Sequence, residues 1–332
     1  MTQNAAEIPV HNTQRKAAIA HGGVRDHAGS VTVTPIEDFD LNRTIFNTLE
    51  GKLPRFVIQT RIAKEAEWAE AISASIEAAY TTTCEARALP EVPQELLTFL
   101  VEQCDFDVEH ADGSFLDHLY FCFEYTNLYL PEHSALVMLL HSILGTGTNT
   151  FAMTADKIPA LKALMNDAEW THVEAFPSVL RLLYDLPLRA ELWSNTHRLD
   201  SLESIRFHRV IDNAPITMTA EDFWLQLNYQ MIHLIDFLPV SNWAAHANDT
   251  AFIIFRDLYA FLNESGKLAA TLNYTPATGS SSVQGEAQSF GAKLVDMLPV
   301  KVSEKMAAKS VRRFSSKIGH SMDYTISWRA SA

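Results

Sequence analysis

Histidines and carboxylates with the spacing of metal ligands are concentrated between His110 and Phe151. This stretch holds four histidines and two aspartates among mostly apolar and aromatic neighbours: His110, Asp112, Asp117, His118, His133 and His141. A polar ring nitrogen buried in such surroundings needs a partner, because an unpaired buried polar group costs about 1–3 kcal/mol. Imidazole is also the commonest protein ligand of metals. The pattern therefore predicts the wall of a metal site.

Two of these histidines are spaced so that neighbouring helices would bring them together. His118 and His141 are 23 residues apart, which is enough for a helix, a turn and an antiparallel return. His141 falls in the last turn of a predicted helix that stops at Gly145, and the partial negative charge of a helix C-terminus suits a cation. Asp117 is expected to orient a neighbouring imidazole by accepting a hydrogen bond from the ring nitrogen that points away from the metal.

A later predicted helix carries a second stripe of polar groups. In the run FWLQLNYQMIHLIDFLP at residues 223–239, polar side chains recur every three or four positions: Gln226, Tyr229, Gln230, His233 and Asp236. Side chains with this spacing share one face of a helix, so that face is either hydrated or lines a site. Together, the two stretches supply three or four nitrogen and oxygen ligands and leave one coordination position open, as catalytic metal sites require.

The two stretches also resemble a known group of proteins. The motif GSFLDHL at 113–119, the motif LLHSILGT at 139–146 and the upstream His110 are similar to a poorly characterised domain family related to HD-type helical metalloenzymes. The resemblance covers about residues 105–240. HD-type enzymes bind one or two metals through a first His, a His-Asp pair and a later Asp, and most are phosphohydrolases, with a minority of iron oxygenases.

The resemblance implies a set of site residues. His118 corresponds to the first His, His141 to the His of the pair and His110 to the extra upstream His of the family. On the later helix, His233 or Asp236 would face the metal. Ser142 stands where the Asp of the pair is expected. Without that bridging carboxylate, we expect one metal rather than two.

We therefore predict a metal-dependent enzyme acting on a small molecule, in which one iron or zinc ion activates water as in a hydrolase. The predicted metal ligands are His110, His118, His141 and His233, and the candidate catalytic residues are Asp117, Tyr229 and Asp236. One alternative is a non-haem iron oxygenase that uses dioxygen. Another is a non-catalytic ligand-binding or scaffold protein derived from an HD-like core, an alternative motivated by Ser142 and by basic residues near the C-terminus.

The elements that must position these residues are predicted to be helices. Helical periodicity dominates from Leu41, and the alternation of a large sheet is missing, so the fold class is mostly α: an HD-like helical bundle core with N- and C-terminal extensions. We expect a flexible arm at 1–40, a helical domain at 41–272, a linker at 273–289 and a helical extension at 290–332. Helices are predicted at 62–80, 94–104, 114–128, 131–144, 155–166, 173–186, 191–210, 219–238, 243–264 and 290–318, with a short edge strand or extended tail at 30–35.

Composition limits the partners and the location. Forty acidic residues against 26 basic ones give a net charge of −14, which argues against non-specific binding of nucleic acid. Three cysteines without paired spacing, no signal peptide and no apolar run long enough for a bilayer predict a cytoplasmic protein without stable membrane insertion. A homodimer is left open.

A basic stripe breaks this acidic background near the C-terminus. It consists of Lys301, Lys305, Lys309, Arg312, Arg313 and Lys317, which recur at helical spacing. A solvated helix face is the simpler interpretation, and contact with an acidic partner, an acidic membrane or a carrier protein is the alternative.

Overall fold

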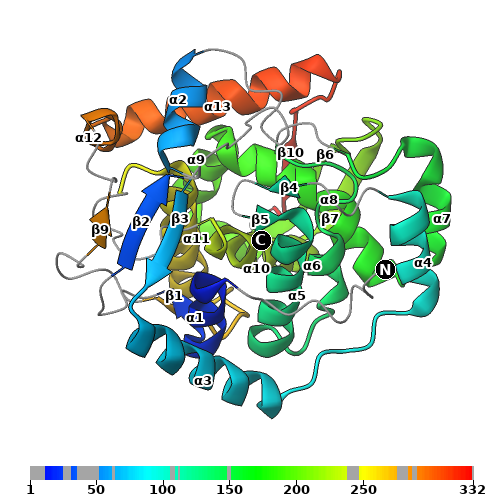
Figure 1. The fold of residues 1–332 in the computed structure, drawn as a ribbon. Helices are drawn as coiled ribbons and strands as arrows, with labels where there is room; N and C mark the ends of the chain where they lie inside the picture. Colours follow the sequence, from blue (N-terminus) through cyan, green and yellow to red (C-terminus); the bar gives the residue numbers. More distant parts are fainter. Residues whose placement is uncertain are drawn as a thin grey trace.

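The computed structural model describes residues 12–24, 31–35, 52–61, 64–104, 109–110, 113–147, 151–237, 247–274, 283–285 and 290–330. Most of these residues are helical, which confirms the predicted mostly α fold (Figure 1). The α-helices are α1 (Thr13–His21), α2 (Lys52–Arg61), α3 (Glu70–Ala86), α4 (Gln94–Gln103), α5 (Phe115–Tyr129), α6 (Leu136–Leu140), α7 (Ile158–Ala163), α8 (Asp167–Tyr184), α9 (Pro187–Ser194), α10 (Ala220–Ile235), α11 (Thr250–Glu264), α12 (Phe290–Asp296) and α13 (Val300–Lys317). Two short 3-10 helices cover Ala155–Lys157 and Thr196–Ser201.

The strands are short and form small sheets among the described residues. They are β1 (Gly23–Val24), β2 (Val31–Pro35), β3 (Lys64–Trp68), β4 (Glu109–His110), β5 (Gly113–Ser114), β6 (Leu202–His208), β7 (Pro215–Thr219), β8 (Asn273–Tyr274), β9 (Val283–Gly285) and β10 (Thr325–Trp328). An antiparallel sheet has the order β10-β6-β7, and a mixed sheet has the order β3-β2-β9. β1 pairs with β8, and β4 pairs with β5.

Helices α5, α6, α8 and α10 form the centre of the fold, and Figure 1 shows them grouped around the middle of the molecule. α10 packs against α5, α8 and α11, and α6 packs against α5 and α8. α10 is buried along almost its whole length from Phe223 to Ile235. A helix that is buried on nearly every side is enclosed by the protein, so the polar groups of α10 lie inside it as well.

Local signals set the ends of these central helices. The Thr219 side chain accepts a hydrogen bond from the backbone of Asp222, so α10 begins where predicted. Asn166 and Glu169 form a capping box, and α8 therefore begins well before the predicted start at 173. The helix predicted over 131–144 is wrong in length, because only α6 is helical there and His141 directly follows its end.

The helix predicted over 191–210 is wrong beyond Ser201. The second half of that range is strand β6, which is joined by a hairpin to β7. Leu202, Ile205 and Phe207 are buried from β6, and Ile216 and Met218 are buried from β7. The sheet packs onto α10, so burial against that helix, rather than helix propensity, decides the structure of this segment.

The helix predicted over 62–80 is also wrong in its first part. Residues 64–68 form strand β3, and α3 begins only at Glu70. Strand β2 matches the strand expected at 30–35, but it lies between β3 and β9 rather than at a sheet edge. These pairings join segments far apart in the sequence, which local periodicity does not report.

Segments outside the predicted helical domain also pack. Helix α1 lies in the predicted N-terminal arm, yet Arg15, Ala17 and Ile19 are buried, and the helix packs against α3 and α5. Strands β8 and β9 lie within the predicted linker, and α12 and α13 lie in the predicted C-terminal extension. The proposed domain boundaries themselves stay predictions. Among the described helices, none is both long enough and apolar enough to cross a membrane.

Candidate metal centre

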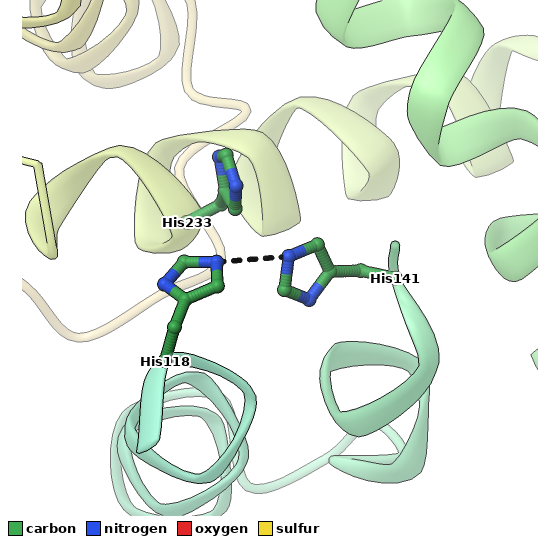
Figure 2. A group of neighbouring side chains, drawn as sticks. All are labelled: His118, His141 and His233. Atoms are coloured by element: carbon green, nitrogen blue, oxygen red, sulfur yellow. Dashed lines mark hydrogen bonds between the residues drawn. The ribbon is translucent and has the colours of Figure 1, made fainter. Parts of the chain in front are cut away.

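Three histidines from three different elements converge in the protein interior (Figure 2). His118 comes from α5, His141 follows α6, and His233 comes from the last turn of α10. One ring nitrogen of each lies within 4.8 Å of those of the other two. All three side chains are buried, and His141 is completely so. The chain therefore has a buried three-histidine cluster that could hold a metal ion.

The rings meet edge to face rather than stacked. Their centroids are 5.0 Å apart for His118 and His141, 5.1 Å for His118 and His233, and 4.7 Å for His141 and His233. The interplanar angles lie between 70° and 81°. Lone pairs lie in the plane of an imidazole ring, so this arrangement lets ring nitrogens point toward a common centre.

Hydrogen bonds on the far side of two rings fix which nitrogen carries the hydrogen. His118 Nδ1 lies 2.7 Å from Asp236 Oδ2, and His141 Nδ1 lies 2.7 Å from the carbonyl oxygen of Met138. A carboxylate and a carbonyl oxygen only accept, so each Nδ1 is a donor. In a neutral imidazole this leaves a lone pair on each Nε2.

The two Nε2 atoms face one another at 3.1 Å, the contact drawn as a dashed line in Figure 2. Two lone pairs at this distance repel one another unless a cation lies between them. For metal–nitrogen bonds of about 2.0–2.1 Å, ligand nitrogens are about 2.9 Å apart at a right angle and about 3.3 Å apart at the tetrahedral angle. The observed distance lies within that range, so the residues present fit a shared metal ion.

Asp236 lies behind His118 and is itself held by an arginine from the start of the chain. Arg15 Nε is 2.8 Å from Asp236 Oδ1, and Arg15 Nη2 is 3.0 Å from Oδ2. Burial favours a raised pKa for Asp236, but the Arg15 guanidinium and the hydrogen bond from His118 outweigh it and hold that pKa well below its usual range. Asp236 is thus an ionised carboxylate that orients the His118 ring.

The walls around the cluster are apolar. The Phe176 ring packs against His141 and His233, at centroid distances of 4.7 Å and 5.3 Å. The Phe237 ring lies 5.0 Å from both His118 and His233. On α5, the Cys122 thiol is completely buried, and burial raises its pKa well above the usual value, so it stays protonated. Such walls exclude water and strengthen electrostatic interactions inside the site.

The other predicted site residues lie elsewhere. The hydroxyl of Tyr229 donates to the carbonyl oxygen of Ser134, and burial raises its pKa, so this group is a buried hydrogen-bond donor outside the cluster. Asp117 is buried on α5 next to His118 but is not one of the converging groups. The backbone of His110 pairs in β4, and its side chain lies outside the described residues.

Sequence reasoning missed Arg15 altogether. The residue lies in a segment predicted to be a loose arm, and its partner Asp236 is 221 residues away. The available signal was the four-residue spacing of Arg15 and the apolar Ile19, which places both on one face of a short helix between the Asn12 cap and Gly22. An arginine on the buried side of such a helix needs a buried acceptor, but nothing local says which one.

The donor set points to a class of metal. The cluster comprises imidazoles alone among the described residues, and nitrogen donors suit zinc and iron rather than calcium or magnesium, which prefer oxygen. Comparisons of the chain with protein-family models, with curated proteins and with solved structures find no match. The likeness to the HD-related family therefore stays a prediction from the two motifs.

Proposed function

We propose that this protein is a metal-dependent enzyme with an HD-related helical core, in which His118, His141 and His233 hold one zinc or iron ion. The observation that carries the proposal is the pair of Nε2 atoms facing one another at 3.1 Å, each in a ring whose Nδ1 is already engaged. Such an ion would supply Lewis-acid chemistry and lower the pKa of a bound water to about 7.

The protein would orient the imidazole ligands and exclude bulk water from the site. Asp236 keeps the hydrogen of His118 on Nδ1, the Met138 carbonyl does the same for His141, and the phenyl rings of Phe176 and Phe237 keep bulk water away. Three imidazoles are neutral ligands, and the charge of Asp236 is offset by Arg15. A divalent ion would therefore keep its charge, which favours a small anionic or oxygen-donor substrate.

Elemental analysis of the purified protein tests the proposal. We expect about one zinc or iron per chain, and loss of that metal in His118→Ala, His141→Ala and His233→Ala. His172→Ala is the matched control, because His172 is equally buried but lies outside the cluster. Unchanged metal content in the three variants, or equal loss in the control, would contradict the proposal.

The metal and the gas that turnover requires would identify the reaction class. Activity with zinc under nitrogen identifies a hydrolase, which we favour. A ferrous requirement with oxygen uptake identifies the iron oxygenase of the alternative prediction. Candidate substrates are small anionic phosphate esters, or neutral carboxylic esters whose carbonyl oxygen acts as the donor.

A second candidate function has one observation in its favour. The 3.1 Å distance also suits a proton shared between His118 and His141, as expected in a metal-free binding or scaffold protein. Metal-free protein that keeps its full thermal stability, and that gains none when zinc or iron is added, would favour this candidate over the enzyme.

A further inference from the structure

Exposed apolar side chains are concentrated on one part of the surface. Eight large apolar residues are exposed in the described part of the chain: Leu53, Phe56, Val101, Leu294, Met297, Val300, Val302 and Ile318. All of them except Val101 lie on α2, α12 or α13, or at the ends of these helices. Met297 is the extreme case, with 77% of its surface exposed. Single exposed apolar residues are ordinary, but a contiguous group marks a contact surface.

These helices form one continuous surface. α2 packs against α12, and a short turn through Pro299 joins α12 to α13. Figure 1 shows α12 and α13 following one another along one side of the molecule. On α13, Ala308, Val311 and Phe314 face the protein, which leaves the opposite side of the helix to solvent.

Lysines lie among the exposed apolar residues. Lys52 is on α2, Lys293 is on α12, and three more occupy the exposed side of α13: Lys301, Lys305 and Lys309. We use the name amphipathic patch for these five lysines together with the exposed apolar residues Leu53, Phe56, Leu294, Met297, Val300 and Val302. Long lysine stems cover apolar surface and carry the ammonium group outward, so both kinds of side chain can contact the same partner.

The lysines of the patch differ from other lysines of the protein. Lys16 pairs with Glu77 and Lys267 pairs with Asp200, each at 2.6 Å, and Lys157 donates to the carbonyl oxygen of Gln103. Within the described part of the chain, none of the five patch lysines forms an ion pair. The acidic residue Glu304 of α13 pairs with Arg189 instead, so the ammonium groups of these lysines stay available to a partner.

We propose that the amphipathic patch docks on the surface of an anionic phospholipid bilayer. Apolar side chains such as Met297 and Leu294 would enter the boundary between headgroups and acyl chains, and the lysines would reach the lipid phosphates. A nucleic acid would use the lysines but leave the aliphatic side chains exposed to water. An acidic protein is the other possible occupant, and the experiment below separates it.

Sedimentation of the full chain with lipid vesicles tests the proposal. We expect binding to phosphatidylcholine vesicles that contain phosphatidylserine, much weaker binding to pure phosphatidylcholine, and release at high salt. Each lysine near an anionic surface changes the affinity about fivefold, so Lys301→Ala with Lys305→Ala should weaken binding about 25-fold. Leu294→Ser with Met297→Ser should weaken it without changing the salt dependence.

Val101→Ser is the matched control, because Val101 is 53% exposed but lies on α4, away from the patch. It should bind vesicles as the unaltered protein does, and circular dichroism should show that every variant is folded. Equal binding to both vesicle types, or no effect of the patch variants, would overturn the proposal. The proposal would also be overturned if the protein does not bind vesicles but binds a polyglutamate peptide or an oligonucleotide, and the lysine variants abolish that binding.

Discussion

Two buried polar residues of helix α10, Gln226 and His233, each contact histidines of other elements, but the contacts differ in kind. Near its start, Gln226 accepts a hydrogen bond from His172 of α8 at 3.0 Å, and burial lowers the pKa of His172, so this ring is neutral. Near its end, His233 meets His118 and His141. At Gln226 an amide oxygen accepts the hydrogen bond from the imidazole, whereas at His233 three imidazoles face one another.

The difference shows that burial alone does not identify a histidine that could bind a metal. His172 is as deeply buried as the clustered histidines. What distinguishes the cluster is the direction of the second ring nitrogen, because Nδ1 of His118 and of His141 is held by an acceptor and Nε2 points at another ring. Two buried carboxylates also differ in their partners. Asp236 is paired with the charged guanidinium of Arg15, whereas Glu124 of α5 accepts a hydrogen bond from the neutral hydroxyl of Tyr80.

The largest effect should come from removing Arg15. Arg15→Ala leaves the buried charge of Asp236 without its guanidinium, and breaking a buried ion pair in this way costs about 3–5 kcal/mol. Loss of the orienting partner should also weaken metal binding about 10- to 100-fold. Urea unfolding and metal titration measure the two effects.

Asp236→Asn in the Arg15→Ala background is the control. It removes the unpaired charge, so stability should recover in part, while metal affinity should stay low because an amide holds His118 less firmly than a carboxylate does. Full stability of the single variant would contradict the view that Asp236 is ionised in the folded protein.

Arg15 also shows where prediction from sequence ends. His118 and His233 lie on helices whose period is visible locally, and His141 directly follows a short helix, so their convergence was predictable. The contact between Arg15 and Asp236 joins elements 221 residues apart in the sequence, and no periodicity encodes it. Strands β3 and β6 were missed for a related reason, because their partners, and not their own residues, decide that they are strands.

Glu124 should make stability depend on pH. Burial raises its pKa to about 7, although Tyr80 and Lys16 act in the opposite direction. Between about pH 4.5 and 7 the folded protein keeps a proton that the unfolded chain releases, so this contribution is complete below pH 4.5 and is lost as the pH rises through 7. The loss should be on the order of 3 kcal/mol by pH 8.

Glu124→Gln keeps an acceptor for Tyr80 and cannot ionise, so its stability should change less than that of the unaltered protein between pH 5 and pH 8. Chemical denaturation at the two pH values measures the difference. Parallel pH profiles of the two proteins would show that Glu124 is already ionised at pH 5.

Metal removal should affect the cluster of His118, His141 and His233 but not the pair of His172 and Gln226. At a metal concentration of about one hundred times Kd, bound metal stabilises the folded protein by about 2.7 kcal/mol, and a chelator should lower the melting temperature accordingly. His172→Ala should melt earlier than the unaltered protein but should still respond to the chelator. His141→Ala should not respond, and a response equal to that of the unaltered protein would exclude His141 as a ligand.

The smallest effect concerns two buried tyrosines of α5 and α10, Tyr125 and Tyr229. The Tyr125 hydroxyl on α5 has no hydrogen-bond partner among the described residues, whereas the Tyr229 hydroxyl on α10 donates to the Ser134 carbonyl. Tyr125→Phe should therefore raise the free energy of unfolding by up to about 1 kcal/mol, because an unsatisfied polar group is removed, and Tyr229→Phe should lower it by about 1 kcal/mol. Urea unfolding resolves both changes. If Tyr125→Phe is destabilising instead, the hydroxyl of Tyr125 binds a buried water.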